Sequence, residues 1–234
     1  MPGEEEKETD DVSGPATTAE GGADASGAST ADSLETLPDV PEGLDADPHA
    51  LAAPPAEVAD LAAACVRFTT ARYGVPLDFT AETLSIVDQW LKDARREVRE
   101  RMETLPLVQA AAGAYLGEVV RRAFGAQWVT GEDHAAWRLC MSTVYLTFNP
   151  IGMVREALTL ETAEGWHAHF ELDPGEQDFI EARLAGLPPV EDEEFYAPST
   201  RFDVVNIVVD ALREHMRGAG LGDVRFTLED YEGR

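Results

Sequence analysis

The feature that most constrains this chain is a run of apolar and small residues over positions 105–120, "LPLVQAAAGAYLGEVV". Placed on a helix, these residues leave almost no polar face, so the helix has to lie inside a domain with other elements around it. Gly113 and Gly117 stand four residues apart in this run. They would let a neighbouring backbone approach closely, although each weakens a helix by about 1 kcal/mol relative to alanine. The run therefore predicts a central buried helix.

Glu118 is the one acid in the core of this run, and Arg121 and Arg122 follow it three and four residues later. Residues at these spacings are neighbours on a helix surface, so the pattern predicts a local ion pair. A carboxylate in apolar surroundings is also a usual form of a general acid or a ligand-binding group. Glu118, Arg121 and Arg122 are therefore the candidate binding residues. The ion pair is the main interpretation, and a small-molecule binder with Glu118 in a helix–sheet pocket is an alternative.

The first 53 residues differ in composition from the rest of the chain. They hold fourteen Asp and Glu against one Lys, and no aromatic residue precedes Phe68. Such a segment cannot bury enough apolar surface to offset the entropy lost on ordering. We therefore expect a disordered acidic tail over residues 1–53 and a single domain over residues 54–234.

The charge and the cysteines narrow the class of protein. A formal net charge of −27 argues against binding nucleic acid or anionic lipid, because phosphates attract Lys and Arg. The opening "MPGEEEKETDD" lacks the basic and apolar regions of a secretory signal, and no stretch reaches the ~20 apolar residues of a membrane span. Cys65 and Cys140 lie outside any CxxC pattern, which is typical of free thiols in a cytosolic protein. The sequence predicts a cytoplasmic protein with no cofactor.

Periodicity outlines the remaining elements. In several segments apolar residues recur at helical spacing, with residues typical of helix caps at the ends. In other segments apolar and polar residues alternate with period two. The predicted helices cover residues 54–73, 80–102, 105–120, 151–160, 174–184 and 200–217, and the predicted strands cover 127–129, 137–141, 144–148, 166–172 and 224–228. This order predicts an α+β fold with helices packed on one face of a small, mainly antiparallel sheet.

The segment "EGWHAHFELD" holds the sharpest chemical question. In an extended strand His167, His169 and Glu171 would point the same way, because side chains alternate. Two imidazoles on one side suit a zinc or iron site, but a protein metal site normally needs three or four ligands. Our main interpretation is a solvated strand face with Trp166 and Phe170 turned inward. A metal-binding domain or metal-dependent enzyme that uses His167 and His169 is the alternative.

Three weaker patterns complete the search. Cys140, His134 and Asp133 have the residue types of a nucleophile, a base and an orienting acid, but no motif surrounds them. The acidic run at 191–194 could serve a magnesium or phosphate site, although such loops are usually just exposed. Lys92, Arg95 and three further arginines on the second helix could dock an acidic partner or the tail, or form a solvated face with ion pairs.

The segments "LDFTAETLSIVDQWL", "GAYLGEVVRRAFGAQWV" and "FNPIGMVREAL" occur in this order over residues 77–160. This arrangement resembles small bacterial α+β domains of unknown function, most specifically in a GAYLGEV-type central helix followed by a Trp-bearing strand. The resemblance implies one domain and a bacterial source, and it implies no catalytic residue.

No P-loop, G-x-S-x-G, dinucleotide fingerprint or HExxH motif occurs in the chain. The sequence therefore favours a non-enzymatic interaction or accessory protein, of a regulatory or immunity type, that binds another protein. In this hypothesis the domain presents a preformed surface, and the acidic arm contributes solubility and electrostatic steering.

Overall fold

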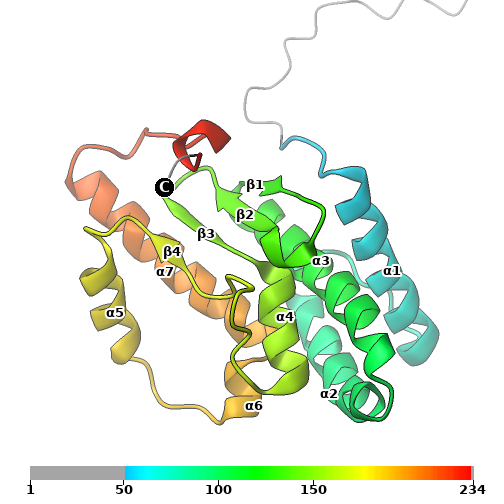
Figure 1. The fold of residues 1–234 in the computed structure, drawn as a ribbon. Coiled ribbons are helices and arrows are strands. Elements are labelled where there is room, and N and C mark those ends of the chain that lie inside the picture. The colour runs from blue at the N-terminus through cyan, green and yellow to red at the C-terminus, as the bar shows by residue number, and fades with distance from the viewer. Residues whose placement is uncertain (1–50, 233–234) are drawn as a thin grey trace, which may run out of the picture. The chain divides into compact units, whose positions relative to one another are not determined.

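The central helix expected from the sequence is α3, Leu105–Phe124. It contacts α1, α2, α4 and α7 as well as the first two strands (Figure 1). Nearly all of its residues from Gln109 to Arg121 are buried, including the alanines and glycines on every side. The rest of the domain is built around α3, as a helix without a polar face requires.

The computed structural model describes residues 51–232, so the predicted acidic tail lies outside the described residues except for its last three positions. Within this part the chain forms seven α-helices and one four-stranded antiparallel sheet. The helices are α1 Ala56–Tyr73, α2 Leu84–Glu100, α3 Leu105–Phe124, α4 Pro150–Thr159, α5 Gln177–Ala185, α6 Asp192–Phe195 and α7 Pro198–Gly218. The strands are β1 Ala126–Val129, β2 Arg138–Met141, β3 Leu146–Phe148 and β4 Glu171–Leu172.

The two glycines of α3 lie where other elements come closest. A Cβ on Gly113 would stand 2.4 Å from the Cα of Ile151 in α4, and a Cβ on Gly117 would stand 2.2 Å from the ring of Trp128 in β1. Both distances are far shorter than real contacts. The predicted close approach is confirmed: one glycine admits a helix backbone and the other a tryptophan ring.

The sheet presents its apolar face to the helices. The strands follow the order β1-β2-β3-β4, and every neighbouring pair is antiparallel. Trp128 pairs with Leu139, and Leu139 pairs with Phe148, so these side chains share one face. All three are buried in the same core cluster as the α3 residues. The predicted fold class, helices on one face of a small antiparallel sheet, is confirmed.

The opposite face of the sheet carries a different row of residues. Gln127 pairs with Cys140, Cys140 with Thr147, and Thr147 with Glu171, so one polar row crosses all four strands. Arg138 lies beside this row, opposite Val129. Cys140, Thr147 and Glu171 of this row, together with Arg138, line the site described below.

One predicted strand is shorter than expected, and another is absent. Residues 164–167 form a turn in which His167 has a φ of 50°, so only Glu171–Leu172 joins the sheet. The alternation of buried and exposed residues over 166–172 persists, but the backbone turns rather than extends. Residues 224–228 also form no strand. The segment is held instead by a bond from the N–H of Phe226 to the carbonyl of Ser142 and by the side chain of Tyr231.

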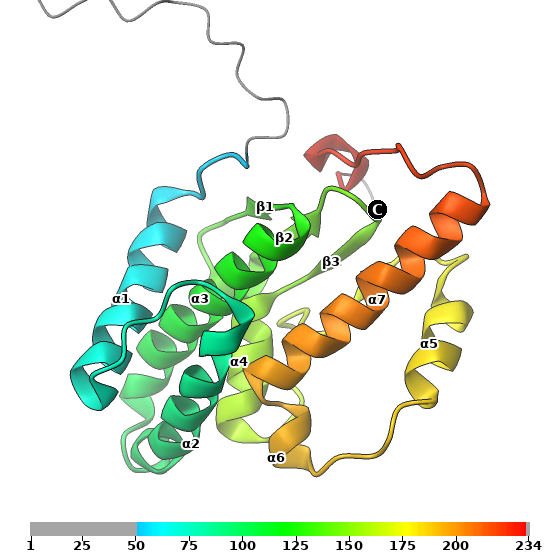
Figure 2. The same cartoon turned by 180° about the vertical axis from the view of Figure 1, so that it is seen from behind.

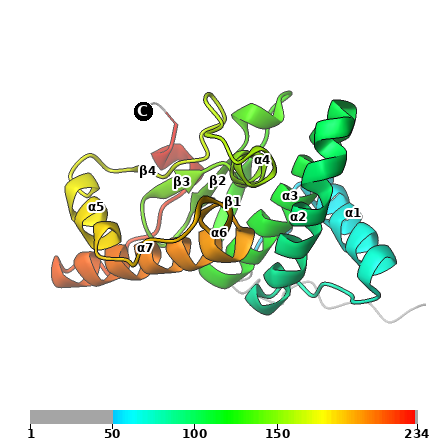
Figure 3. The same cartoon turned by 90° about the horizontal axis from the view of Figure 1, so that it is seen from below.

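The last three helices lie beside one another, and α7 runs the length of the group (Figure 2). Seen from below, α5 lies alongside α7, with α6 close to its first turns (Figure 3). The amino end of α7 is tied to α2, because Asp88 accepts bonds from the backbone N–H of Ser199 at 3.1 Å and from its hydroxyl at 2.5 Å. Across the described residues, no helix combines the length and apolarity needed to cross a membrane.

Candidate functional site on the open face of the sheet

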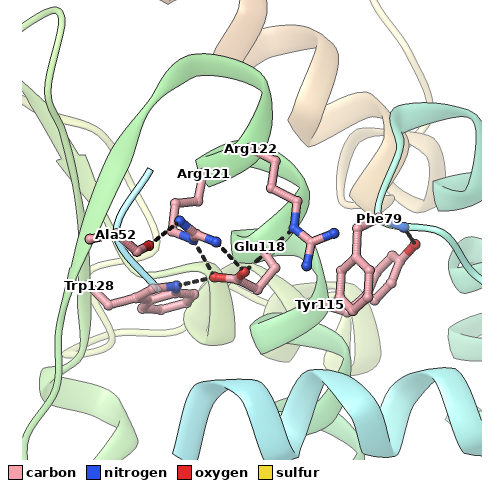
Figure 4. A network of polar contacts seen from close by, with 7 residues as sticks. All are labelled: Ala52, Phe79, Tyr115, Glu118, Arg121, Arg122 and Trp128. Carbon is pink, nitrogen blue, oxygen red and sulfur yellow. Dashed lines mark hydrogen bonds and ion pairs between the residues drawn. The ribbon is translucent and has the colours of Figure 1, made fainter. Parts of the chain in front are cut away.

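The three candidate binding residues on α3 do come together (Figure 4). Glu118 is 1% exposed and accepts two bonds from Arg121, from Nε to Oε1 at 2.7 Å and from Nη2 to Oε2 at 2.9 Å. The indole N–H of Trp128 donates to Oε1 at 2.9 Å, and Nε of Arg122 lies 3.7 Å from Oε2. The carboxylate thus has partners on both oxygens, all of them supplied by the chain.

The two arginines continue this network outward. Nη1 of Arg121 donates to the carbonyl of Ala52, which holds the start of the described chain against α3. The guanidinium of Arg122 lies 3.9 Å above the ring of Phe79 (Figure 4). This geometry fits the structural ion pair. A ligand-binding role for Glu118, Arg121 and Arg122 stays a prediction.

The two histidines separate. Nδ1 of His167 lies 2.6 Å from Oε1 of Glu171, whereas Nε2 of His169 lies 3.6 Å from Oε1 of Glu156. Because of the turn at His167, the two imidazoles lie beside different carboxylates. Within residues 51–232 no group of three or more His, Cys, Asp or Glu residues has the geometry to hold a metal ion.

Glu156 is a buried charge that the sequence analysis missed. It is 0% exposed, and it accepts a bond from Nη2 of Arg201 at 2.7 Å and one from the N–H of Ala163 at 3.1 Å. Arg201 is buried too, and its guanidinium lies 4.3 Å from the ring centre of Phe195. A lone acid among the apolar residues of "IGMVREAL" was the available signal, but its partner is 45 residues away.

The proposed nucleophile set does not assemble. Asp133 accepts from the N–H of Ala135, and His134 lies edge-on to Trp137 with Nε2 3.6 Å from Glu57. Cys140 is on the open face of the sheet, with its Sγ 3.4 Å from Oγ1 of Thr147. Burial raises the pKa of the Cys140 thiol, so the thiol stays protonated at neutral pH and is a poor nucleophile.

The acidic run at 191–194 and the basic helix are partners of each other. Glu193 in α6 lies 3.0 Å from Nζ of Lys92 and 3.1 Å from Nη1 of Arg95, both on α2. These contacts lower the pKa of Glu193, chiefly through the bond to Lys92. Part of the α2 basic face therefore forms ion pairs within the domain itself.

The open face of the sheet forms a pocket of about 880 Å³. No residue of an α-helix lines it. The walls come from all four strands, from the turn at His167, and from the C-terminal segment. The lining residues are Val129, Arg138, Cys140, Tyr145, Thr147, His167, Glu171, Leu172, Asp173, Pro174, Leu228, Tyr231 and Glu232.

Tyr231 closes one side of this open-face pocket. Its hydroxyl lies 2.8 Å from the carbonyl oxygen of Met141 and accepts the N–H of Leu146 at 3.1 Å, so it bridges the turn between β2 and β3. Its ring stacks on Tyr145 with the centroids 4.6 Å apart. Burial raises the pKa of Tyr231. These contacts fix the C-terminal segment against the sheet, where it forms one wall of the open-face pocket.

Sequence reasoning missed this site because its members are distributed from position 129 to position 232. One signal was available. Side chains alternate along the strand predicted over residues 137–141, and this alternation places Arg138 and Cys140 together on one face. Nothing local showed that Glu171 and Tyr231 would join them.

Comparison with known proteins gives one similarity. Residues 38–143, just under half of the chain, match the model of a family of unknown function (DUF6278). The matched span runs through α1, α2, α3 and the first two strands, and it includes the central helix. Neither curated proteins nor solved structures give a match. The similarity agrees with the expected domain of unknown function and carries no activity.

Proposed function

We propose that this chain is a non-enzymatic interaction protein whose domain binds a segment of a protein partner in the open-face pocket. The observation that carries the proposal is the pocket itself. One face of the sheet is covered by helices, whereas the other is hollowed to about 880 Å³ and lined by charged and aromatic side chains. Clefts of this size with a few convergent polar groups are the usual places where proteins bind ligands.

The contacts and burial of the reactive side chains support binding rather than catalysis. Glu118 and Glu156 are buried in ion pairs with Arg121 and Arg201. The thiol of Cys140 is held protonated by burial. These groups stabilise the domain in its present form, and a rigid, preformed surface is the property that an interaction module needs.

Charge indicates the kind of partner. The chain carries −27 overall, so a basic partner is attracted at long range and an acidic one is repelled. In this proposal the acidic arm over residues 1–53 increases the rate of encounter. Both cysteines are free and buried, which fits a reducing compartment, and we therefore propose a cytoplasmic role.

Peptide selection against the full chain tests the proposal. The random peptide library is displayed with both free and blocked C-termini. Peptides that bind the wild type should lose about tenfold or more in affinity for Val129→Trp, which fills the pocket from an exposed position on β1. Val75→Trp is the matched control, because Val75 is exposed to a similar degree but does not line the pocket. A selection that enriches no peptide, or peptides that bind both variants equally, contradicts the proposal.

A further inference from the structure

Arg138 differs from the three buried arginines in the described part of the domain in what it contacts. Its Nη1 donates to the carbonyls of Trp137 at 2.7 Å and Ala135 at 3.2 Å. Within the described residues it forms no ion pair, and its Nε and Nη2 make no hydrogen bond. Arg95, Arg121 and Arg201 each have a carboxylate within 3.1 Å. Arg138 has its charge in the pocket wall without one.

This arrangement leaves the binding edge of the guanidinium available. The two carbonyl bonds fix one nitrogen, while Nε and Nη2 form the edge that binds a carboxylate through two parallel bonds. Burial lowers the pKa of Arg138, because water solvates its charge less well there than at a free surface. A partly desolvated cation without a partner gains more from an incoming anion than an exposed one does.

The rest of the pocket is negative. Glu171 lies on the same face of the sheet and interacts electrostatically with Arg138, and Glu232 also lines the pocket. The stacked rings of Tyr145 and Tyr231 lie between strand and C-terminal segment. Their aromatic surface suits the aliphatic stem and charged end of a long basic side chain. A ligand that complements both the guanidinium of Arg138 and the acidic, aromatic part of the pocket carries one carboxylate and one positive charge.

We infer that the open-face pocket binds the C-terminal residue of the partner, a lysine or arginine whose terminal carboxylate pairs with Arg138 while its side chain extends toward Glu171. This inference rests on the proposed function and specifies its ligand. One C-terminal basic residue supplies both charges within a volume of about 880 Å³. Capture of a terminal carboxylate is an established mode of peptide recognition.

Fluorescence anisotropy with the full chain tests this inference. The probe is an eight-residue Gly-Ser peptide that ends in arginine and is labelled at its N-terminus. The free acid should bind about tenfold or more tightly than the same peptide with an amidated C-terminus, and than one that ends in alanine. Equal binding of the acid and the amide would overturn the inference.

Val129 offers a matched pair of variants because it stands directly opposite Arg138 in the register. Val129→Glu places a carboxylate next to the guanidinium and should reduce the affinity for the free acid about tenfold, whereas Val129→Gln should leave most of it. Both variants change the same exposed position, so circular dichroism should show an unchanged fold. The same affinity in the two variants would contradict the role of Arg138.

Two outcomes separate this inference from the proposed function. If displayed peptides with blocked C-termini bind and lose binding in Val129→Trp, the pocket binds partners but the terminal carboxylate is not what it recognises. If free arginine competes as strongly as the peptide, the ligand is an amino acid and the inferred protein terminus is wrong.

Discussion

Arg121 holds both oxygens of the Glu118 carboxylate from one turn further along α3, at 2.7 and 2.9 Å. Because both side chains are almost fully buried, the pair is insulated from solvent, and each charge depends on the other. Trp128 adds a third bond and so links the helix to β1. The contact therefore joins the central helix to the sheet.

Replacement of Glu118 by glutamine should destabilise the domain strongly. It leaves Arg121 buried without a counter-charge, and breaking a buried pair on one side costs about 3–5 kcal/mol. Urea denaturation followed by tryptophan fluorescence measures the change. Glu181→Gln, at an exposed position of α5, is the control and should stay within about 0.5 kcal/mol of wild type. An unchanged midpoint for Glu118→Gln would instead favour a ligand role.

Gly113→Ala should be poorly tolerated. The added Cβ would meet the backbone of Ile151 at 2.4 Å, and backbone cannot move aside as a side chain can. We expect a loss of about 3 kcal/mol in the free energy of unfolding, at the upper end for overpacked cores. Gly218→Ala provides the comparison: it ends α7 with no atom within 4 Å of the new Cβ, and should stabilise the domain by up to about 1 kcal/mol. Equal effects of the two substitutions would show that α3 and α4 can separate.

Stability should fall at alkaline pH, partly through Tyr231. Its pKa is raised by burial, so above the ordinary tyrosine pKa of about 10 the unfolded chain loses a proton that the folded chain keeps. The unfolded state then binds fewer protons, and the unfolding free energy decreases by about 1.4 kcal/mol per pH unit for this group. Tyr231→Phe should be less stable at pH 8 and should show a shallower decline between pH 10 and 11. If the unfolding free energies of the wild type and Tyr231→Phe decreased with the same slope, this account would be contradicted.

Chelation should not change the stability of the protein. His167 and His169 lie against Glu171 and Glu156 respectively, so a shared ion would require both contacts to break. We expect untagged protein to contain no stoichiometric transition metal by elemental analysis, and the double variant His167→Ala/His169→Ala to have the same metal content. A bound metal that this variant loses would restore the metal-site hypothesis.

Glu193→Gln should have a small effect that depends on salt. Its carboxylate is about half exposed, so the pairs with Lys92 and Arg95 are screened, and exposed pairs contribute only about 0–1 kcal/mol. The difference from wild type in urea denaturation should shrink as the ionic strength approaches about 1 M. A loss that is large and insensitive to salt would mean that α6 holds α2 and α7 together by other contacts as well.

Local patterns in the sequence predicted much of the fold. The helix predicted over residues 80–102 corresponds to α2, where Leu84, Val87 and Leu91 are buried. The helix predicted over residues 151–160 corresponds to α4, which Asn149 caps through bonds from the N–H groups of Ile151 and Gly152. These features depend on residues within a few positions of one another, so they can be recognised without the tertiary structure.

The site could be predicted only in part. Alternation placed Arg138 and Cys140 on one face of β2, but the same rule extended β4 backward over His167, where the backbone turns. The period-two pattern was correct for burial, since Ala168 is buried and His169 exposed. It was wrong for the hydrogen bonding, because a turn can alternate its side chains without pairing to a sheet.

The amino-acid sequence by itself determined the central helix, the α+β class and the side of each strand that faces the core, because these follow from hydrophobic spacing along short segments. Spacing along the helix was enough to pair Glu118 with Arg121, whereas only the tertiary structure decided the surroundings of the other buried charges. Glu156 pairs with Arg201 from another helix, and Arg138 lies in a pocket wall where it forms no ion pair among the described residues. The free energy of a buried charge depends on the groups that folding places around it, and those groups lie far apart in the chain.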